Sequence, residues 1–380
     1  MRLRIYIGFI VGIAALSLSR PLAAQSVPSV VSIENEVLEK YLNDSDYDTT
    51  DYSYTHMSKY VPERYGQCDK PAPVVFSWDV WNPWKEMQLE ICDMNDPTTP
   101  IARYIIPTSQ LSCRVYNLIP ERIYAYVLLG KSFDKLFPVE EGTFFVEGRR
   151  RMIKADFVTN IRDFGGLRTE DGRAIRYGRL FRGAALDHIR NGARSPIANA
   201  EGVAVLRDML NIGADIDLRS AKELLLTDGD PSNDMTNSLL GKDVEYYNIN
   251  IPDFGGVKSS HRYGKVIAQV VDCLSRGKNV YIHCAAGADR AGMLSFLLAA
   301  MAGVTENDLA RDYEITSLAH GGSARHARNA LGAYNYAPTI QYIKANFHGR
   351  TFAEKVQNYL IAQHDVTREQ INTLQRILVE

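Results

Sequence analysis

The chain has 380 residues, of which 46% are hydrophobic and 23% are charged, and it contains five cysteines. This composition excludes a disordered chain and a small disulfide scaffold, and the length allows two domains with a core each. The formal net charge is −2, and it becomes more negative without residues 1–25, which carry three arginines and no acid. We therefore expect no nucleic-acid partner, because general nucleic-acid binding depends on cationic side chains.

Residues 1–25 have the features of a secretory signal peptide. A basic start precedes an apolar run from Ile5 to Leu18, and small residues follow. The run is shorter than the about 20 residues that a bilayer span needs. We expect cleavage near Ala24 or Ser26 and an exported protein, periplasmic or secreted, with no stable transmembrane span after processing. An uncleaved anchor is the alternative.

Export would place the five cysteines in an oxidising compartment. The odd number leaves at least one thiol unpaired within the chain. Cys68, Cys92 and Cys113 lie in the first half of the chain, and one pair among them is a candidate disulfide. The sequence does not indicate which pair.

The first half after the signal divides into an extension and a β-rich module. Residues 26–70 are expected to form a linker or N-terminal extension with one short helix. In residues 71–147, the segment Met87–Ile91 alternates apolar and polar side chains, and turn residues separate several such runs. This pattern predicts a small all-β sandwich with a packing or docking role.

The segment Asn117–Pro120, which precedes Tyr124 and Tyr126, resembles the tyrosine corner of fibronectin type III modules. Trp78 lies early in the same segment, as a tryptophan does in such modules. We therefore expect residues 71–147 to be a fibronectin type III-like β-sandwich.

Residues 150–380 alternate strand and helix patterns. Ala214–Leu218, Tyr246–Ile251 and Val280–His283 are typical of buried strands, and helical spacing separates or follows them. Such alternation predicts an α/β domain whose mainly parallel central sheet is flanked by helices.

The segment from His283 to Gly292 reads HCAAGADRAG and contains the candidate chemistry. It predicts a strand that ends near Cys284, a loop of small residues, and a helix that begins near Arg290. Such a loop lets backbone amides converge on an anion, and the helix N-terminus adds its positive dipole. Arg290 can bind two phosphate oxygens, and the positive field is expected to lower the pKa of Cys284. A buried structural cysteine beside a capping arginine is the alternative.

The stretch from Cys284 to Arg290 matches the Cys-x5-Arg loop of protein tyrosine phosphatases. Residues 160–168 (NIRDFGGLR), 179–183 (RLFRG) and 217–220 (DLRS) resemble segments of the bacterial and fungal tyrosine phosphatase family. The resemblance covers residues 150–380. It implies a Cys-dependent phosphatase domain that hydrolyses phosphate monoesters without a metal or cofactor. The substrate would be a phosphotyrosine protein or a phosphorylated small molecule or lipid. A protein phosphatase with dual specificity is an alternative within this family.

The resemblance also implies roles for individual residues. Cys284 would attack phosphorus and form a phosphocysteine that water hydrolyses. Arg290 and the amides of the loop would bind the equatorial oxygens. The loop residues concerned are Ala285, Ala286, Gly287, Ala288, Asp289 and Arg290. His283 would orient the backbone of Cys284, although a hydrogen-bonded core histidine is an equal interpretation.

Two aspartates compete for the role of general acid. Asp289 lies inside the loop, as in phosphatases of this family, and we favour it. Asp253 follows Pro252 and resembles the Pro-Asp acid loop of other tyrosine phosphatases, but it is also explained as an ordinary turn aspartate. Asp217 is expected to support the site, by holding one of its arginines.

Two positions depart from the family pattern. In the family a Ser or Thr usually stands at the position of Ala291, and its hydroxyl assists the departing sulfur. We therefore expect slow hydrolysis of the phosphocysteine. Ala288 stands where phosphoinositide-specific members often have Lys, which favours phosphoproteins over polyanionic lipids.

Two rival functions are weighed against the protein phosphatase. A phytase-like inositol polyphosphate phosphatase would need a wider basic pocket, to which Arg325 and Arg328 could contribute. A phosphate-binding pseudophosphatase with a docking role is the rival from another class. Intact Cys284 and Arg290 argue against it, and Ala291 argues weakly for it.

Overall fold

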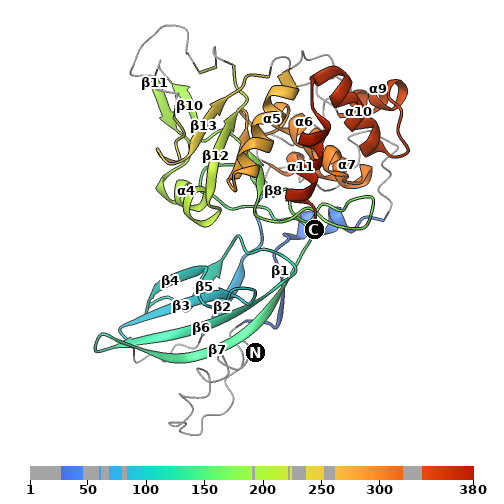
Figure 1. Cartoon of the computed structure of the whole chain (residues 1–380). Helices are drawn as coiled ribbons and strands as arrows, with labels where there is room; N and C mark the ends of the chain where they lie inside the picture. The colour runs from blue at the N-terminus through green and yellow to red at the C-terminus, as the bar shows by residue number, and fades with distance from the viewer. Residues whose placement is uncertain are drawn as a thin grey trace.

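The computed structural model describes residues 27–45, 60, 68–78, 84–190, 193–220, 223–224, 237–251, 262–319 and 336–380. The chain forms an N-terminal β-sandwich and a larger α/β domain (Figure 1). The predicted signal peptide, residues 1–25, lies outside the described residues.

Two sheets form the sandwich. One sheet has the strand order β1-β7-β6-β3-β4, and the other pairs β2 with β5. All their pairings are antiparallel except that of β1 with β7. The strands are β1 (Val30–Ser32), β2 (Val74–Ser77), β3 (Glu86–Asp93), β4 (Ala102–Pro107), β5 (Ser112–Val115), β6 (Arg122–Ser132) and β7 (Lys135–Glu147).

The two sheets share one apolar core. Along β3, Met87, Leu89 and Ile91 are buried and the residues between them are not, as the alternation in the sequence predicts. Tyr124 on β6 is fully buried, and its hydroxyl accepts a hydrogen bond from the Ile119 amide at 2.9 Å and contacts the Ile119 carbonyl at 3.1 Å. This geometry is that of a tyrosine corner. The likeness to fibronectin type III modules stays a prediction.

The expected disulfide among Cys68, Cys92 and Cys113 is wrong, because the structure has all five cysteines as free thiols. Cys113 faces the sandwich core, whereas Cys92 lies on the half-buried outer face of β3. Cys68 packs instead against a different cluster, beside Leu38 and Tyr41. Alternation along the strands therefore points Cys113 of β5 into the core between the two sheets, and points Cys92 of β3, in the other sheet, away from that core.

The sheet of the α/β domain has the order β13-β12-β14-β9-β8. The pairings of β12 with β13 and β14, and of β14 with β9, are parallel, and only that of β8 with β9 is antiparallel. The predicted mainly parallel sheet is confirmed. Its strands are β8 (Arg162–Asp163), β9 (Leu180–Gly183), β12 (Ile212–Asp217), β13 (Glu245–Asn248) and β14 (Asn279–His283), and β10 (Asp187–Arg190) and β11 (Ala193–Pro196) form a separate hairpin.

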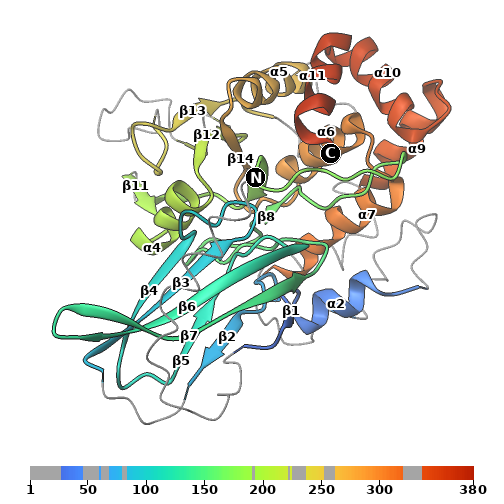
Figure 2. The same ribbon diagram turned by 60° about the horizontal axis from the view of Figure 1, so that its bottom comes forward.

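Helices cover both faces of this sheet (Figure 2). On β14, Val280 and Ile282 pack into the cluster of the C-terminal helices, whereas Tyr281 packs on the opposite face against Leu206. The helices are α4 (Ala200–Ala204) with the π-turn η1 (Val205–Met209), α5 (Arg262–Ser275), α6 (Arg290–Ala302), α7 (Glu306–Ile315) with the turn η3 (Thr316–Leu318), α9 (Tyr336–Asn346), α10 (Phe352–His364) and α11 (Arg368–Leu378). In the part of the chain that the structure describes, no helix is long and apolar enough to cross a membrane.

The described parts of residues 26–70 are built into the fold, which corrects their description as a linker. Helix α2 (Glu36–Leu42) begins at Asn35, whose side chain accepts from the Leu38 amide, and it buries Leu38 and Tyr41. Both side chains pack in one cluster with Ile315 of α7 and with residues of the α/β domain. The Tyr41 hydroxyl lies 3.0 Å from the Glu314 carboxylate in a buried contact.

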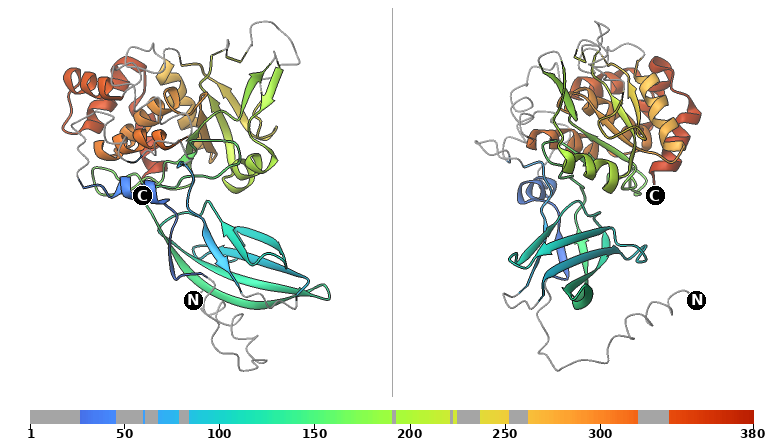
Figure 3. Two further views of the ribbon diagram at one scale, coloured as in Figure 1. Left: turned by 180° about the vertical axis from the view of Figure 1, so that it is seen from behind. Right: turned by 90° about the vertical axis from the view of Figure 1, so that its left-hand side faces the viewer.

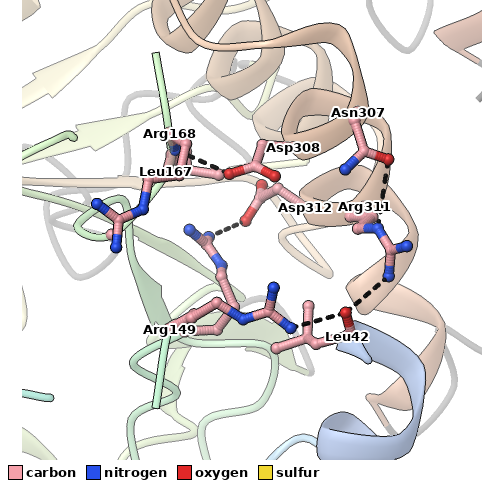
Figure 4. A pocket seen from close by; sticks show the side chains of 10 residues that line it. Leu42, Arg149, Leu167, Arg168, Asn307, Asp308, Arg311 and Asp312 are labelled. Atoms are coloured by element: carbon pink, nitrogen blue, oxygen red, sulfur yellow. Dashed lines mark hydrogen bonds and ion pairs between the residues drawn. The ribbon is translucent and has the colours of Figure 1, made fainter. Parts of the chain in front are cut away.

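Two arginines hold the C-terminal end of α2. The guanidinium groups of Arg149 and Arg311 both donate to the Leu42 carbonyl, at 2.7 and 3.2 Å (Figure 4). A helix C-terminus favours such cations because its last carbonyls are unpaired. The two side chains line a cavity of about 100 Å³ at this junction, and Asp312 of α7 lies on its wall. The extension is thus fixed to the domain that carries the predicted site.

Candidate active site

The predicted loop lies at the carboxyl end of a central strand. β14 ends at His283, Cys284 follows, and α6 begins at Arg290. Ligands of open α/β sheets bind beyond this end of the strands. The loop brings Cys284, which is 2% exposed, to the N-terminal end of a helix of 13 residues.

The carbonyl oxygens of the loop are turned toward the protein. Four successive carbonyls accept hydrogen bonds from outside the loop: Ala285 from the Ala185 amide at 3.1 Å, Ala286 from the Asn160 amide nitrogen at 3.2 Å, and Gly287 and Ala288 from Arg182 Nη2 at 2.8 and 3.3 Å. In a trans peptide the N–H points opposite to the C=O. The amides of residues 286–289 therefore point away from these donors, which is the orientation that anion binding requires.

Glycine is required at position 287 for two reasons. Its φ is +65°, in the left-handed region that other residues rarely adopt. A Cβ there would also lie 2.3 Å from the carbonyl group of Gly183 on β9. Close packing of the loop on β9 thus depends on the absence of a side chain.

Arg290 is buried, and its guanidinium forms a two-pronged ion pair with Glu223. Nη1 and Nη2 each donate to one carboxylate oxygen at 2.7 Å. The hydrogen bonds from Arg290 are the main reason that the pKa of Glu223 falls to about 2. Glu223 also accepts from the Ser220 amide, and its own amide donates to the Ser220 hydroxyl, as in a capping box.

His283 is buried between two carboxylates. Its Nε2 lies 3.1 Å from Asp215, and its Nδ1 lies 3.8 Å from Asp217 and 3.4 Å from the Cys284 carbonyl. Burial alone would lower the pKa of His283, but the charges of Asp217 and Asp215 outweigh it and raise that pKa. Asp217, which we expect to hold an arginine of the site, binds Arg219 at 2.6 Å, whereas Arg290 binds Glu223.

A buried cluster of charges lies behind the loop. Arg182, which holds the loop carbonyls, also binds Asp312 at 3.2 Å, and Arg162 and Arg150 bind the same carboxylate. Burial would raise the pKa of Asp312, but the three guanidinium groups hold it well below its ordinary range. Arg182 and Arg162 lie in segments that the sequence had singled out for the resemblance, but no role had been assigned to them.

The N-terminal extension reaches the same supports. Asp69 is fully buried, and its carboxylate accepts from the Asn160 amide at 2.6 Å. The Asn160 side chain donates to the Ala286 carbonyl and accepts from Arg162 at 2.6 Å. One residue of the extension is therefore two hydrogen bonds away from the loop, and no local motif had indicated it.

Of the two candidate general acids, the structure describes Asp289 and not Asp253. Asp289 occupies the N-cap position of α6 and is 4% exposed, and its side chain makes no capping hydrogen bond. Asp253 lies outside the described residues, as do Arg325 and Arg328.

Ala291, which follows Arg290 and has no hydroxyl, is fully buried in the core of the domain. Among the described residues, no cluster of three or more His, Cys, Asp or Glu side chains could hold a metal.

Comparisons with known proteins agree with this geometry. The sequence profile of the tyrosine phosphatase family matches residues 153–380. A curated protein of Cupriavidus necator, named as a candidate tyrosine-protein phosphatase, is 27% identical over 214 residues, which are 51% of this chain and 73% of that protein.

Two solved structures are similar to parts of the chain. The core catalytic domain of the PP-IP phosphatase SIW14 from S. cerevisiae is 15% identical over 45% of this chain and 91% of that chain, with a TM-score of 0.25. A redesigned β-sandwich protein is 18% identical over 20% of this chain and 82% of that chain, with a TM-score of 0.18.

Proposed function

Since this chain belongs to the tyrosine phosphatase family, a family of phosphatase enzymes, we propose that it hydrolyses phosphotyrosine in proteins through a phosphocysteine on Cys284. One observation carries the proposal. The four loop carbonyls are held from behind, so that the loop amides turn toward the side where a phosphate would lie. Cys284 and Arg290 stand at the two ends of that loop.

The proposed reaction has two steps. The Cys284 thiolate attacks phosphorus, the bond from phosphorus to the ester oxygen breaks, and Asp289 protonates the departing oxygen. Water then attacks the phosphocysteine and gives a proton to the Asp289 carboxylate, the sulfur–phosphorus bond breaks, and Cys284 leaves as a thiolate. The loop amides and Arg290 stabilise the charge on the equatorial oxygens in both steps. Without a hydroxyl at position 291, the second step is expected to be the slow one.

Glu223 has a role of its own in this scheme, as the ion-pair partner of Arg290. The Glu223 carboxylate contacts both prongs of the Arg290 guanidinium at 2.7 Å. An arriving phosphate dianion has the same planar two-oxygen match to the guanidinium and exchanges with it. Glu223 thereby keeps the arginine oriented and limits the binding of weak anions.

The test is a substrate panel with the full chain and its Cys284→Ser variant. Phosphotyrosine peptide, phosphoserine peptide, inositol hexakisphosphate and a soluble phosphoinositide are compared at equal concentration. We expect turnover of the phosphotyrosine peptide in the wild type, loss of turnover in Cys284→Ser, and a phosphoenzyme trapped by rapid denaturation only in the wild type. Preferred turnover of inositol hexakisphosphate would show that the substrates are inositol polyphosphates and not phosphotyrosine proteins. Binding without any turnover would indicate a pseudophosphatase.

The cellular location is proposed separately. Residues 1–25 are proposed to be removed during export, because a basic start, a short apolar run and small residues occur in that order. Amino-terminal sequencing of the protein from producing cells should begin between residues 25 and 27. A chain that begins at Met1 and stays in the cytoplasmic fraction would contradict export.

A further inference from the structure

The hairpin formed by β6 and β7 ends in an exposed apolar tip, which comprises residues 131–139. Its strands pair as far as Ser132 with Lys135, next to the turn. The exposed apolar side chains are Phe133 at 86%, Leu136 at 44%, Phe137 at 42% and Val139 at 39%. Figures 1 and 3 show this tip at the end of the sandwich that points away from the α/β domain.

Apolar side chains lie on both faces of the tip. Leu136 and Phe137 are successive residues of a strand, so they point to opposite faces, and both are exposed. Farther along the same strand, Phe144 and Val146 are buried in the core. The hairpin thus runs beyond the core of the sandwich, and its tip exposes apolar side chains on both faces, with the Phe137 ring stacked on Trp84 at 5.8 Å between centroids.

The turn itself holds an aromatic residue in an unfavourable conformation. Phe133 and Asp134 have φ angles of +47° and +59°, which are the values of a two-residue hairpin turn. Asn and Gly are the usual residues there, and a bulky side chain at positive φ is strained. Strain of this kind is typical of functional positions.

Lysines surround the tip. Lys131 and Lys135 flank the turn, and Lys85, the residue before β3, places its ammonium 5.9 Å from the Phe133 ring centroid. Glu86 is paired with Lys131 at 3.5 Å, Asp134 lies in the turn, and Glu140 and Glu141 follow the tip on β7, where Glu140 accepts from the Tyr126 hydroxyl. Cations beside exposed aromatic and aliphatic side chains match the interface of a membrane with anionic lipids.

We propose that this tip docks the protein on an anionic membrane surface. Phe133, Leu136 and Phe137 enter the boundary between headgroups and acyl chains, and the lysines contact lipid phosphates. A protein partner would cover one face of a narrow hairpin, whereas a lipid interface surrounds the tip and covers both. The proposal does not depend on the phosphatase reaction.

The test is sedimentation of the full chain with vesicles of phosphatidylcholine alone or with about a quarter phosphatidylglycerol. Phe133→Asp should lower the affinity for the anionic vesicles about tenfold or more, because a buried aromatic group is replaced by a charge. Lys131→Gln with Lys135→Gln should lower it less and weaken its salt dependence. The matched control is Phe157→Asp, since Phe157 is 71% exposed with φ +63° but belongs to the α/β domain.

A second measurement tests whether the tip itself enters the membrane. Residues 1–25 do not affect the comparison, because all variants share them. Fluorescence of a Phe133→Trp variant should shift to the blue on anionic vesicles and be quenched by brominated lipid, whereas that of Phe157→Trp should not. Equal behaviour of the two, or equal binding of wild type and Phe133→Asp, would overturn the proposal. So would self-association of the wild type that Phe133→Asp abolishes, because the tip would then be a contact between copies.

Discussion

Between Val74 and Glu147 the described buried side chains are almost all apolar, and Asp93 is the buried charged residue there. The α/β domain instead buries several charged groups, and they gather around the Cys284 loop. Arg162, Arg182 and Asp217 are each at most 1% exposed. The sandwich obtains its stability from the burial of apolar side chains. The α/β domain also buries charged side chains, whose desolvation costs free energy.

The difference indicates what the buried charges do. Desolvation of an ion pair is offset only by excellent geometry, so such pairs contribute little net stability. Arg182, Asn160 and Asp69 each bind the loop or a residue that binds it. Removal of one partner destabilises the fold where it leaves a buried charge unpaired, but Asp312 keeps two other arginines when Arg182 is lost. At such positions the loss should affect catalysis more than folding, and loss of a sandwich contact should do the reverse.

The largest effect is expected for Arg182→Met. Asp312 keeps Arg150 and Arg162 as partners, so the fold should survive, but the carbonyls of Gly287 and Ala288 lose their donor. We expect kcat on an aryl phosphate to fall about 10²-fold, because misplaced amides lose transition-state contacts. The control is Arg122→Met, whose partner is Asp93 in the sandwich. Equal loss of activity in both variants would contradict the comparison.

Asp69→Asn should have an intermediate effect. The amide keeps the size of the carboxylate but weakens the bond to the Asn160 amide, and Asn160 holds the Ala286 carbonyl. We expect about a tenfold lower kcat with little change in KM, measured at constant pH. Glu36→Gln is the control in the same extension, because Glu36 is exposed and pairs only with Lys40 among its described contacts. A drop in Tm without a change in kcat would make Asp69 purely structural.

The sequence predicted the loop because all its elements are contiguous: the end of β14, the small residues, Arg290 and the helix. The alternation on β3 and the helical spacing around β14 predicted the two architectures for the same local reason. Arg182 reaches Asp312, and Asp69 reaches Asn160, only through tertiary contacts that no period or spacing indicates. The disulfide expectation failed because proximity in sequence does not tell which face of a strand a thiol occupies.

The third prediction concerns pH. The pKa of His283 is raised in the folded chain by Asp217 and Asp215, although burial opposes them. Its contribution to stability is therefore complete below the unfolded value of about 6.5 and is lost as the pH rises through the raised folded value. Asp215→Asn should flatten the fall of Tm over that interval above about pH 6.5. An unchanged slope would show that the pair with Asp215 does not carry this dependence.

The smallest effect is expected in the sandwich. Tyr124→Phe removes the hydroxyl that bonds to the Ile119 backbone and leaves the buried ring in place. The free energy of unfolding should fall by about 1 to 2 kcal/mol, because the Ile119 amide loses a partner. Urea unfolding followed by tryptophan fluorescence measures this change, and kcat on the aryl phosphate should remain that of the wild type. If kcat fell with stability intact, the sandwich would be coupled to the loop, and the division between an apolar support and a charged catalytic interior would not hold.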